Sequence, residues 1–349
     1  MHPSRPRHLH GLEFQTAVRR WSAAAISMAA LALALLAVPP AAEAGQLLVS
    51  GGGDGISTGS VLRYDSTTGA FLGAVARGAP IGGSAPNGIA IGPDGKLYVG
   101  TGNDHSVLRY DLATNTFIDT FVAPRSGGLV GAGGIAFGPD GNLYVASLNT
   151  DNVLRYNGRT GAFIDIFATG GLSIPTFLKF GPDGNLYVSS ESSDRVVRFN
   201  GHTGAFIDIF IPAGSGGLDG PDGLLFGPDG KLYVASVFND KVLRFDAGTG
   251  AFIDTFVSAG SGGLDGPLDL LFGTDHNLYV ISAFTNSVLR FDGMTGAFVD
   301  TFVPPGSGGL DSPGWMILLP VPEPAGAAML LAGLAALALA RARPRSQEP

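Results

Sequence analysis

The feature that most constrains the fold is a unit of about 46 residues that recurs through the middle of the chain. Each unit contains a Leu-Tyr-Val segment, whose tyrosine stands at positions 98, 144, 187, 233 and 279. Four of these segments follow Gly-Pro-Asp-Gly, and the fifth follows the related sequence Gly-Thr-Asp-His. Self-similarity at such a period is typical of propellers and solenoids, in which neighbouring repeats bury a common core.

Each unit holds four short segments rich in β-branched and aromatic residues. A Gly-Ile-Ala-Ile type comes first, followed by Leu-Tyr-Val, Val-Leu-Arg and Phe-Ile-Asp types. Turns rich in Gly, Asp and Asn separate them, and no unit contains a helical period over ten residues. The pattern predicts a four-stranded propeller blade and excludes a helical solenoid. A parallel β-helix is the alternative, but its coils are usually shorter and lack hairpin turns such as 292–296.

The number of segments predicts an all-β, six-bladed β-propeller from Gln46 to Leu319. The Val-Leu-Arg and Phe-Ile-Asp types each occur six times, whereas no Gly-Ile-Ala-Ile type precedes residue 46. A candidate for the missing strand lies at the far end, at 314–319. We therefore expect 314–319 to pair with 47–50, so that N- and C-terminal strands complete one blade and leave no free sheet edge there.

A fixed spacing predicts an ion pair repeated in five blades. The arginine of the Val-Leu-Arg segment is followed ten residues later by an aspartate, and a hairpin between the two segments would place both side chains on one face. The first unit departs from this rule because Gly73 stands where the aspartate is expected. The expected pairs are Arg109–Asp119, Arg155–Asp165, Arg198–Asp208, Arg244–Asp254 and Arg290–Asp300.

The first 44 residues have the features of a secretory signal peptide. A region with four arginines precedes an apolar run at 23–38, and Ala42-Glu43-Ala44 provides small residues at the expected cleavage positions. We expect cleavage after Ala44, which would make Gly45 the mature N-terminus. The alternative is a retained membrane anchor, for which the apolar run is short.

The C-terminal segment 321–349 has three parts. A motif of Val321, Pro322, Glu323 and Pro324 precedes an apolar run at 325–340, and a basic tail at 341–349 follows. A helix over the apolar run would span about 24 Å, which is shorter than a bilayer core of about 30 Å. Snorkelling arginines and local thinning of the bilayer could cover the difference. Basic residues favour the cytoplasmic side. The tail arginines are Arg341, Arg343 and Arg345.

This three-part segment resembles the PEP-CTERM sorting signal of Gram-negative bacteria, in the order and terminal position of its parts. The resemblance implies a transmembrane helix at 325–340, recognition by an exosortase, removal of the tail, and delivery to the cell surface or the exopolysaccharide matrix. The expected division of the chain is a signal peptide at 1–44, a propeller at 45–320 and a sorting signal at 321–349. A linker before an ordinary membrane anchor is the alternative, in which the C-terminal helix is retained.

The repeated unit resembles NHL-repeat propellers. The stretch 134–146, Gly-Ile-Ala-Phe-Gly-Pro-Asp-Gly-Asn-Leu-Tyr-Val-Ala, matches that family's pattern closely, and 152–156 continues it. The resemblance covers about residues 46–320. It implies the fold but not the function, because such propellers include binding modules, lyases and lactonases.

Composition excludes several classes of protein. The chain has no Cys, so a disulfide framework, a zinc-finger site and a cysteine nucleophile are excluded. Residues 45–320 carry 14 Lys and Arg against 25 Asp and Glu, a net charge of −11. A phosphate backbone requires a basic face, so we expect no nucleic-acid partner. The partners we expect are an exosortase for sorting, and an exopolysaccharide or a surface protein as ligand, with no cofactor.

One face of the propeller is expected to vary between blades. The Gly-Pro-Asp-Gly and Thr-Gly turns recur almost unchanged on one face, which indicates a scaffold, whereas the loops before the Val-Leu-Arg strands differ on the other. If a ligand binds a face, we expect this variable face; the alternative is that Asn and Asp stand there because they suit turns. The candidate residues are Asp104, His105, Asp151, Glu191, Asp194 and Asp240.

Neither metal chemistry nor catalysis is favoured by these residues. The aspartates of the variable loops belong to separate blades, too far apart to share one cation. Metal-dependent lactonase propellers use Glu, Asn and Asp around the central channel, but Glu191 is the only glutamate in 46–320. Streptogramin-lyase propellers need a histidine and a glutamate, and His105 has no evident partner. We expect a non-catalytic binding module; a lyase-like or lactonase-like enzyme acting in the central channel is the alternative.

Overall fold

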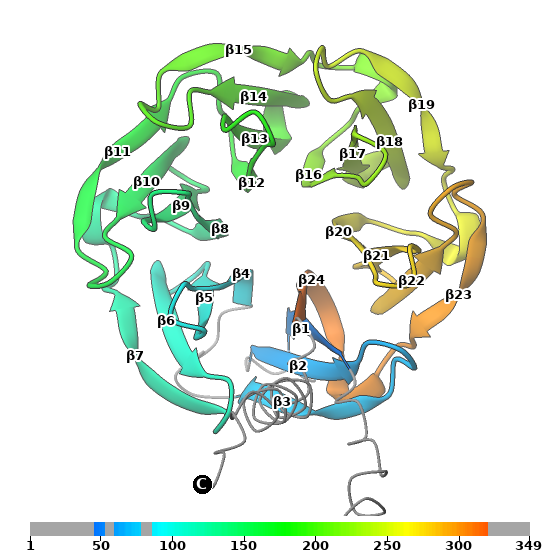
Figure 1. Cartoon of the computed structure of the whole chain (residues 1–349), viewed down its shortest axis with the longest axis horizontal. Helices are drawn as coiled ribbons and strands as arrows, with labels where there is room; N and C mark the ends of the chain where they lie inside the picture. Colours follow the sequence, from blue (N-terminus) through cyan, green and yellow to red (C-terminus); the bar gives the residue numbers. More distant parts are fainter. Residues whose placement is uncertain (1–44, 53–58, 78–85, 320–349) are drawn as a thin grey trace, which may run out of the picture. The chain divides into compact units, whose positions relative to one another are not determined.

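The chain folds into a ring of six four-stranded antiparallel sheets, the blades of a β-propeller (Figure 1). The computed structural model describes residues 45–52, 59–77 and 86–319. The expected signal peptide, including Ala42 and Ala44, and the expected sorting segment 321–349 lie outside the described residues. Among the described residues, no helix is long and apolar enough to cross a membrane.

Each blade is named here by its position in the ring, and its strands are given from the innermost to the outermost. Blade 1 comprises β24 (Asp311–Leu319), β1 (Gln46–Gly52), β2 (Ser60–Asp65) and β3 (Phe71–Arg77). Blade 2 comprises β4 (Pro86–Ile91), β5 (Leu97–Thr101), β6 (Ser106–Asp111) and β7 (Thr116–Val122). Blade 3 comprises β8 (Ala132–Phe137), β9 (Leu143–Ser147), β10 (Asn152–Tyr156) and β11 (Phe163–Thr169).

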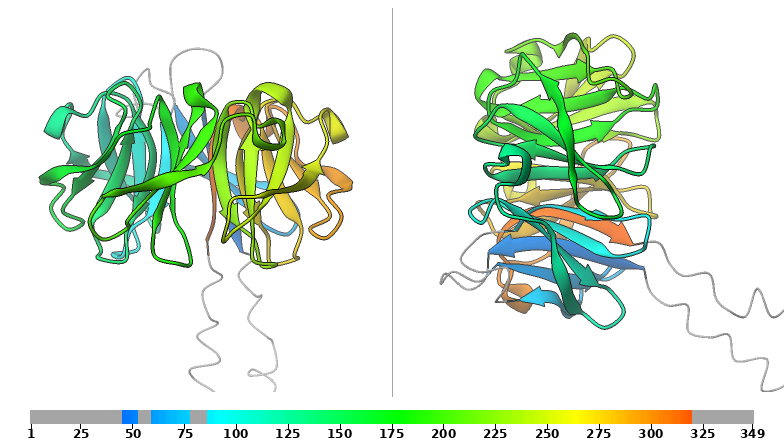
Figure 2. Two further views of the ribbon diagram at one scale, coloured as in Figure 1. Left: turned by 90° about the horizontal axis from the view of Figure 1, so that it is seen from above. Right: turned by 90° about the vertical axis from the view of Figure 1, so that its left-hand side faces the viewer.

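The remaining blades repeat this order. Blade 4 comprises β12 (Pro175–Phe180), β13 (Leu186–Ser190), β14 (Arg195–Phe199) and β15 (Phe206–Ile211). Blade 5 comprises β16 (Pro221–Phe226), β17 (Lys231–Ser236), β18 (Lys241–Asp246) and β19 (Phe252–Val257). Blade 6 comprises β20 (Pro267–Phe272), β21 (Leu278–Ser282), β22 (Ser287–Phe291) and β23 (Phe298–Val303). Seen from the side, the connecting loops emerge on two opposite faces of the ring (Figure 2).

The expected closure of the ring is confirmed. Strand β24 pairs antiparallel with β1, with Leu47 opposite Leu318 and Val49 opposite Met316 (Figure 1). The strand is longer than predicted because it begins at Asp311, beyond a register shift after Val49. The Ser50 hydroxyl occupies this irregularity and accepts a hydrogen bond from the Trp315 amide at 2.9 Å.

The tyrosine of each Leu-Tyr-Val strand joins neighbouring blades. Tyr98 is fully buried, and its ring makes edge-to-face contacts with Phe121 of its own blade and Phe137 of blade 3, each at a centroid distance of 4.8 Å. Its hydroxyl donates to Asp94 of the Gly-Pro-Asp-Gly turn at 3.1 Å. The same contacts recur around the tyrosines of blades 3 to 5, so the repeated residues build the inter-blade core and hold its turns.

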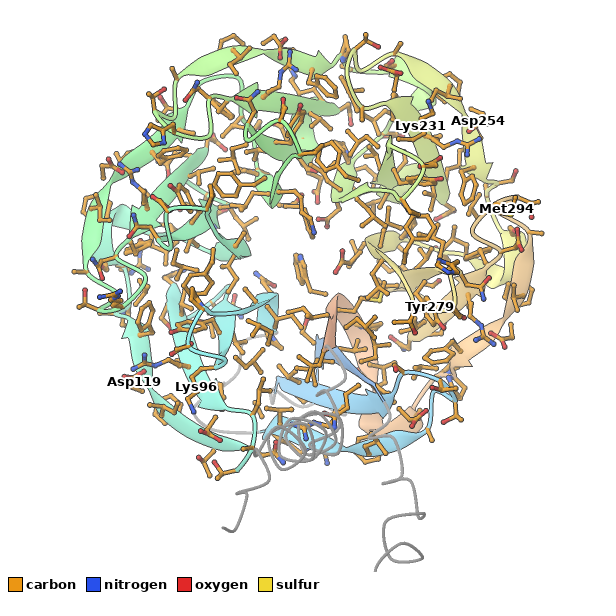
Figure 3. The ribbon with its side chains drawn as sticks, viewed as in Figure 1. Lys96, Asp119, Lys231, Asp254, Tyr279 and Met294 are labelled. Carbon is orange, nitrogen blue, oxygen red and sulfur yellow. The ribbon has the colours of Figure 1, made fainter. Side chains whose placement is uncertain are left out.

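The five expected cross-strand ion pairs are also present. Arg and Asp stand directly opposite each other in all five hairpins, at N–O distances of 2.5–2.6 Å. Asp119 and Asp254 of two of these pairs lie at the outer edge of the ring (Figure 3). In blade 1, Gly73 lies opposite Arg63 as expected, and Arg63 instead donates to the Leu112 carbonyl and to Asn115 Oδ1, both at 2.9 Å.

Short 3₁₀ turns lie between the blades and after some second strands. Glycines with positive φ allow four of them to pack beneath a phenylalanine of the next blade; at Gly127, a Cβ would lie 2.1 Å from the Phe163 ring. The turns are η1 (Ser126–Gly128), η2 (Glu191–Ser193), η3 (Ser215–Gly217), η4 (Val237–Asn239), η5 (Ser261–Gly263) and η6 (Ser307–Gly309).

Candidate functional site

Four of the six residues expected on the variable face tie adjacent blades together. Each stands in the left-handed backbone region, with φ of 51–58°, which Asp, Asn and His tolerate better than most side chains. Each side chain accepts a hydrogen bond from a backbone amide of the next blade, at 2.8–2.9 Å. The pairs are His105 Nδ1 with Gly131, Asp151 with Ile174, Asp194 with Gly220, and Asp240 with Gly266. In blade 6, Asn286 binds the Ser312 amide in the same way.

These inter-blade bonds predict a difference between two substitutions of Asp240. Alanine removes the acceptor for the buried Gly266 amide and must adopt a φ of 58°, so Asp240→Ala should destabilise the propeller by about 2 kcal/mol or more. Asp240→Asn should cost less than about 1 kcal/mol, because Asn286 fills the equivalent position in blade 6. Urea unfolding measures both variants. An equal loss of unfolding free energy in the two variants would contradict the role of Asp240 as an acceptor for the Gly266 amide.

The other two expected residues lie apart from each other. Asp104 lines an open pocket of about 450 Å³ together with His105 and Arg125, at the loop that precedes β6. Glu191 begins η2 in blade 4 and is half-buried, and burial raises the pKa of its carboxyl. The six candidate residues therefore belong to separate blade loops, except for the neighbours Asp104 and His105. Among the described residues, no group of three or more His, Asp or Glu side chains could hold a metal ion.

The central channel offers a different kind of site. The innermost strands of all six blades line a cavity of about 330 Å³, a volume within the range of small-molecule pockets. Its lining is mostly aliphatic and aromatic. Trp315 of β24 and Phe177 of β12 contribute aromatic rings from equivalent positions of their strands. Lys179 and Asp269 are the ionisable residues that line it. Such a cavity favours a ligand with an apolar body.

Asp269 is a buried carboxylate whose two oxygens are both hydrogen-bonded to backbone amides. It is 5% exposed, and its oxygens accept hydrogen bonds from the Leu270 amide at 2.8 Å and from the Met316 amide of blade 1 at 2.9 Å. Burial raises its pKa to about 6, although these two amides and the charge of Lys179 act in the opposite direction. Asp269 thus links β20 to the closing strand β24.

Asp222 is the least satisfied acid among the described residues. It lies on β16 at 2% exposure, and its Oδ1 has no hydrogen-bond partner. Burial raises the pKa of its carboxyl well above the usual value, and the negative charges of Glu191 and Asp269 raise it further. Burial therefore raises the pKa of three carboxyls, on blades 4 to 6.

The raised pKa values predict that acidification stabilises the propeller. Between about pH 4 and 6 the folded protein holds protons that the unfolded chain has released, so the free energy of unfolding falls as pH rises through this range. For Asp269, a pKa of about 6 instead of 3.8 corresponds to a cost of about 3 kcal/mol at neutral pH. We expect a higher melting temperature at pH 5 than at pH 7.5.

Asp222→Asn should raise the melting temperature at pH 7.5 by several degrees and flatten this pH dependence, because the amide removes a buried charge whose Oδ1 has no hydrogen-bond partner. Asp219→Asn, on an exposed residue three positions away, is the matched control and should change neither quantity. Calorimetry from pH 5 to 8 measures both. If the melting temperature of Asp222→Asn depended on pH as steeply as that of the wild type, the burial of the Asp222 charge would be contradicted.

The channel residues were not among those expected from the sequence. The sequence nevertheless distinguishes them, because each differs in residue type from the residues at the equivalent strand position of other blades. Lys179 pairs opposite Tyr187 where other blades place Ala90 or Leu225 opposite the tyrosine. Asp269 precedes the buried Leu270, where blade 2 has Gly88 before Ile89. An alignment of the six innermost strands would have identified both.

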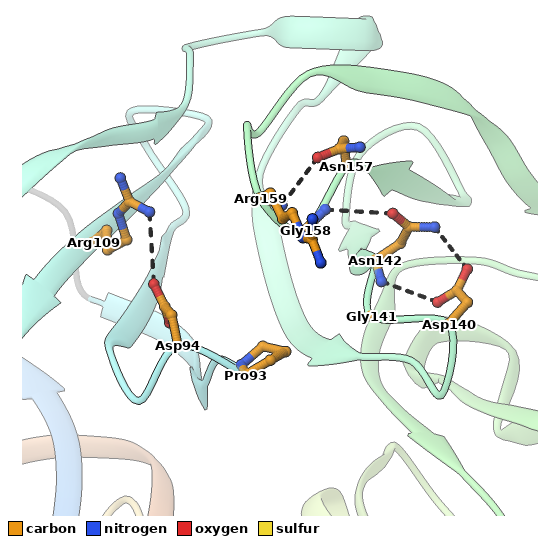
Figure 4. A pocket seen from close by; sticks show the side chains of 9 residues that line it. All are labelled: Pro93, Asp94, Arg109, Asp140, Gly141, Asn142, Asn157, Gly158 and Arg159. Carbon is orange, nitrogen blue, oxygen red and sulfur yellow. Dashed lines mark hydrogen bonds and ion pairs between the residues drawn. The ribbon is translucent and has the colours of Figure 1, made fainter.

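A larger, open pocket lies on the repeated face and belongs to the scaffold. It has a volume of about 640 Å³ and lies among turns of blades 2 and 3 (Figure 4). Three of its charged groups are engaged in the repeated contacts: Arg109 lies 3.7 Å from Asp94, and Asp140 accepts two hydrogen bonds from Asn142. Arg159, in the turn of blade 3, also lines this pocket.

Comparisons with known proteins concern the fold alone. No protein-family model and no curated protein matches this sequence. One chain of the nidogen/laminin complex is similar at 19% identity and a TM-score of 0.64, over 78% of this chain and 98% of that one. A Bacteroides caccae protein of unknown function is similar at 15% identity and a TM-score of 0.59, over 78% of this chain and 99% of that one. A third similar structure is a catalytically inactive variant of virginiamycin B lyase from Staphylococcus aureus, solved with quinupristin. Its identity is 17% and its TM-score 0.51, over 71% of this chain and 82% of that one. The chain thus has the fold of six-bladed β-propellers.

Proposed function

We propose that this chain is an exported protein that an exosortase sorts to the cell surface or the extracellular matrix, where the propeller acts as a non-catalytic binding module. The terminal motifs support the first part: a signal-peptide pattern that ends at Ala44, and the Val-Pro-Glu-Pro motif with its apolar run and basic tail at 321–349. The ligand site is the central channel, because its lining departs from the repeat there.

The observation that carries the binding proposal is the chemistry of the channel lining. Catalysis by proton transfer needs a positioned acid and base within reach of the substrate. The two ionisable groups of the lining are Lys179 and Asp269, and both oxygens of Asp269 already accept backbone amides. The other residues of the lining are apolar or glycine. This arrangement supports retention of a ligand rather than its conversion.

The likeness to a lyase does not favour the enzymatic alternative. The described histidines are His105, His202 and His276, and none of them lines the channel cavity. His105 accepts an inter-blade amide, and the other two lie in turns of the repeated face. A lyase of the streptogramin type would need a histidine with an acidic partner where the substrate binds.

A glycan and peptide array tests binding in the channel. The full chain in detergent would be compared with Ala136→Phe, which fills the cavity beside Lys179, and with Met294→Ala, whose side chain is 88% exposed on the repeated face. We expect Ala136→Phe to lose the ligands of the channel, which the wild type and Met294→Ala bind, and mass spectrometry to recover those ligands unchanged. Recovery of eliminated or hydrolysed products would establish the enzyme instead.

A further inference from the structure

Two aromatic rings stand exposed at equivalent positions of blades 5 and 6. Phe238 and Phe284 follow the second strand of their blades on the variable face, and they are 59% and 69% exposed. Blades 3 and 4 have Asn149 and Ser192 at this position. Large exposed apolar side chains mark interaction surfaces when they gather and depart from the scaffold pattern.

Both rings are held in place by the loops beneath them. Each packs against a glycine with positive φ, Gly220 or Gly266, at which a Cβ would lie 2.5 or 2.7 Å from the ring. The Phe238 amide donates to the Asp219 carbonyl at 3.3 Å, and the Phe284 amide donates to the Asp265 carbonyl at 3.2 Å. The rings are therefore positioned before a partner arrives, which lowers the entropic cost of binding.

An aspartate accompanies each ring. Asp219 and Asp265 are exposed, and their carboxylates make no hydrogen bond or ion pair with the described residues. In blades 3 and 4, where the phenylalanine is absent, Val130 and Ser173 stand in place of the aspartate, whereas blade 1 has Asp311 there without the ring. Ring and carboxylate thus occur together in two adjacent blades. We call Phe238 with Asp219, and Phe284 with Asp265, the Phe–Asp pairs.

Elsewhere in this chain, a phenylalanine and an aspartate together bind an arginine side chain. On the outer strands of five blades the two residue types surround an arginine: Arg244 Cζ lies 5.0 Å from the centre of the Phe256 ring, and its Nη2 lies 2.6 Å from Asp254. A guanidinium is flat and weakly hydrated, so it suits stacking on a ring and pairing with a carboxylate together. The propeller's net charge of −11 adds a long-range attraction for cations.

We propose that the Phe–Asp pairs form a two-part site for arginine side chains of a partner protein, one arginine per blade. The proposal adds a second binding site to the surface role proposed above, and it rests on loop residues of the variable face and not on the channel. Its failure therefore leaves the channel site untouched, and the two can be separated by variants.

Synthetic peptides test this site on the full chain in detergent. Biotinylated peptides with two arginines separated by one to eight glycines are immobilised, and protein binding is measured by interferometry. We expect one spacing to bind best, binding to weaken with salt, and citrulline peptides to bind at least tenfold more weakly. The double variants Phe238→Leu/Phe284→Leu and Asp219→Asn/Asp265→Asn should each weaken binding at least tenfold, with melting temperatures near that of the wild type.

Two controls make the result decisive. Met294→Ala removes an exposed apolar side chain from the repeated face, and Ala136→Phe fills the channel, so both should bind the arginine peptides like the wild type. Absence of arginine-peptide binding at millimolar concentration, or equal binding by the double variants, overturns the proposal. Binding of a soluble polysaccharide that needs the rings but neither the aspartates nor low salt would also overturn it, and would identify a carbohydrate surface.

Discussion

Deleting residues 311–349 should unfold the propeller, whereas deleting 321–349 should leave it folded. Strand β24 covers β1, where Leu47, Leu48 and Val49 are at most 1% exposed. Exposing such side chains costs about 1.5–3 kcal/mol each, and the lost side chains of β24 add to this, so the sum is comparable to the total stability of a domain. The longer deletion also leaves a sheet edge unpaired.

Circular dichroism and calorimetry of the two truncated proteins measure this effect. The shorter deletion is the matched control, since the paired strand ends at Leu319 and remains complete. We expect a cooperative transition near the wild-type temperature for that control, and none for the longer deletion. A cooperative transition at the same temperature in both would show that closure by β24 is dispensable.

Replacing Pro322, Glu323 and Pro324 together by alanine should leave the protein anchored in the membrane and unprocessed. The two prolines disfavour a helix and hold the segment extended, which makes it accessible to a processing enzyme at the membrane surface. Deleting 321–349 should have the opposite effect and release a soluble protein. Both effects should be nearly complete, because each variant removes a required part of the proposed signal.

Fractionation of the producing cells followed by immunoblotting measures where each variant goes. Replacing Ser346, Gln347 and Glu348 by alanine is the control, since these residues lie beyond the tail arginines, and it should be sorted like the wild type. Normal processing of the triple-alanine variant would contradict the exosortase proposal and favour an ordinary anchor.

The fold could be predicted from the sequence because its determinants are local and repeated. Six copies of the same strand types predicted the blades, and the strand missing before residue 46 predicted the closure. The register shift after Val49 and the start of β24 at Asp311 could not be predicted, since they depend on the Ser50 side chain binding the backbone of Trp315, which is 265 residues away in the sequence.

The candidate site was less accessible to such reasoning. Variability predicted that the loops before the Val-Leu-Arg strands differ, but not that Asp194 and Asp240 bind amides 26 residues further along the chain. That role becomes visible when adjacent blades are placed side by side. Lys179 and Asp269 stand out only after the innermost strands are aligned, because their chemistry depends on the channel that six blades form together.

Intact-mass analysis of the protein recovered from the surface of producing cells tests the central proposal of an exported and sorted binding propeller most directly. The proposal predicts a mass that begins at Gly45 and lacks the apolar run and basic tail at 325–349, with a cut near Pro322-Glu323-Pro324. A displayed protein that still carries residues 325–349 would contradict it, and would show that the C-terminal segment is a permanent anchor.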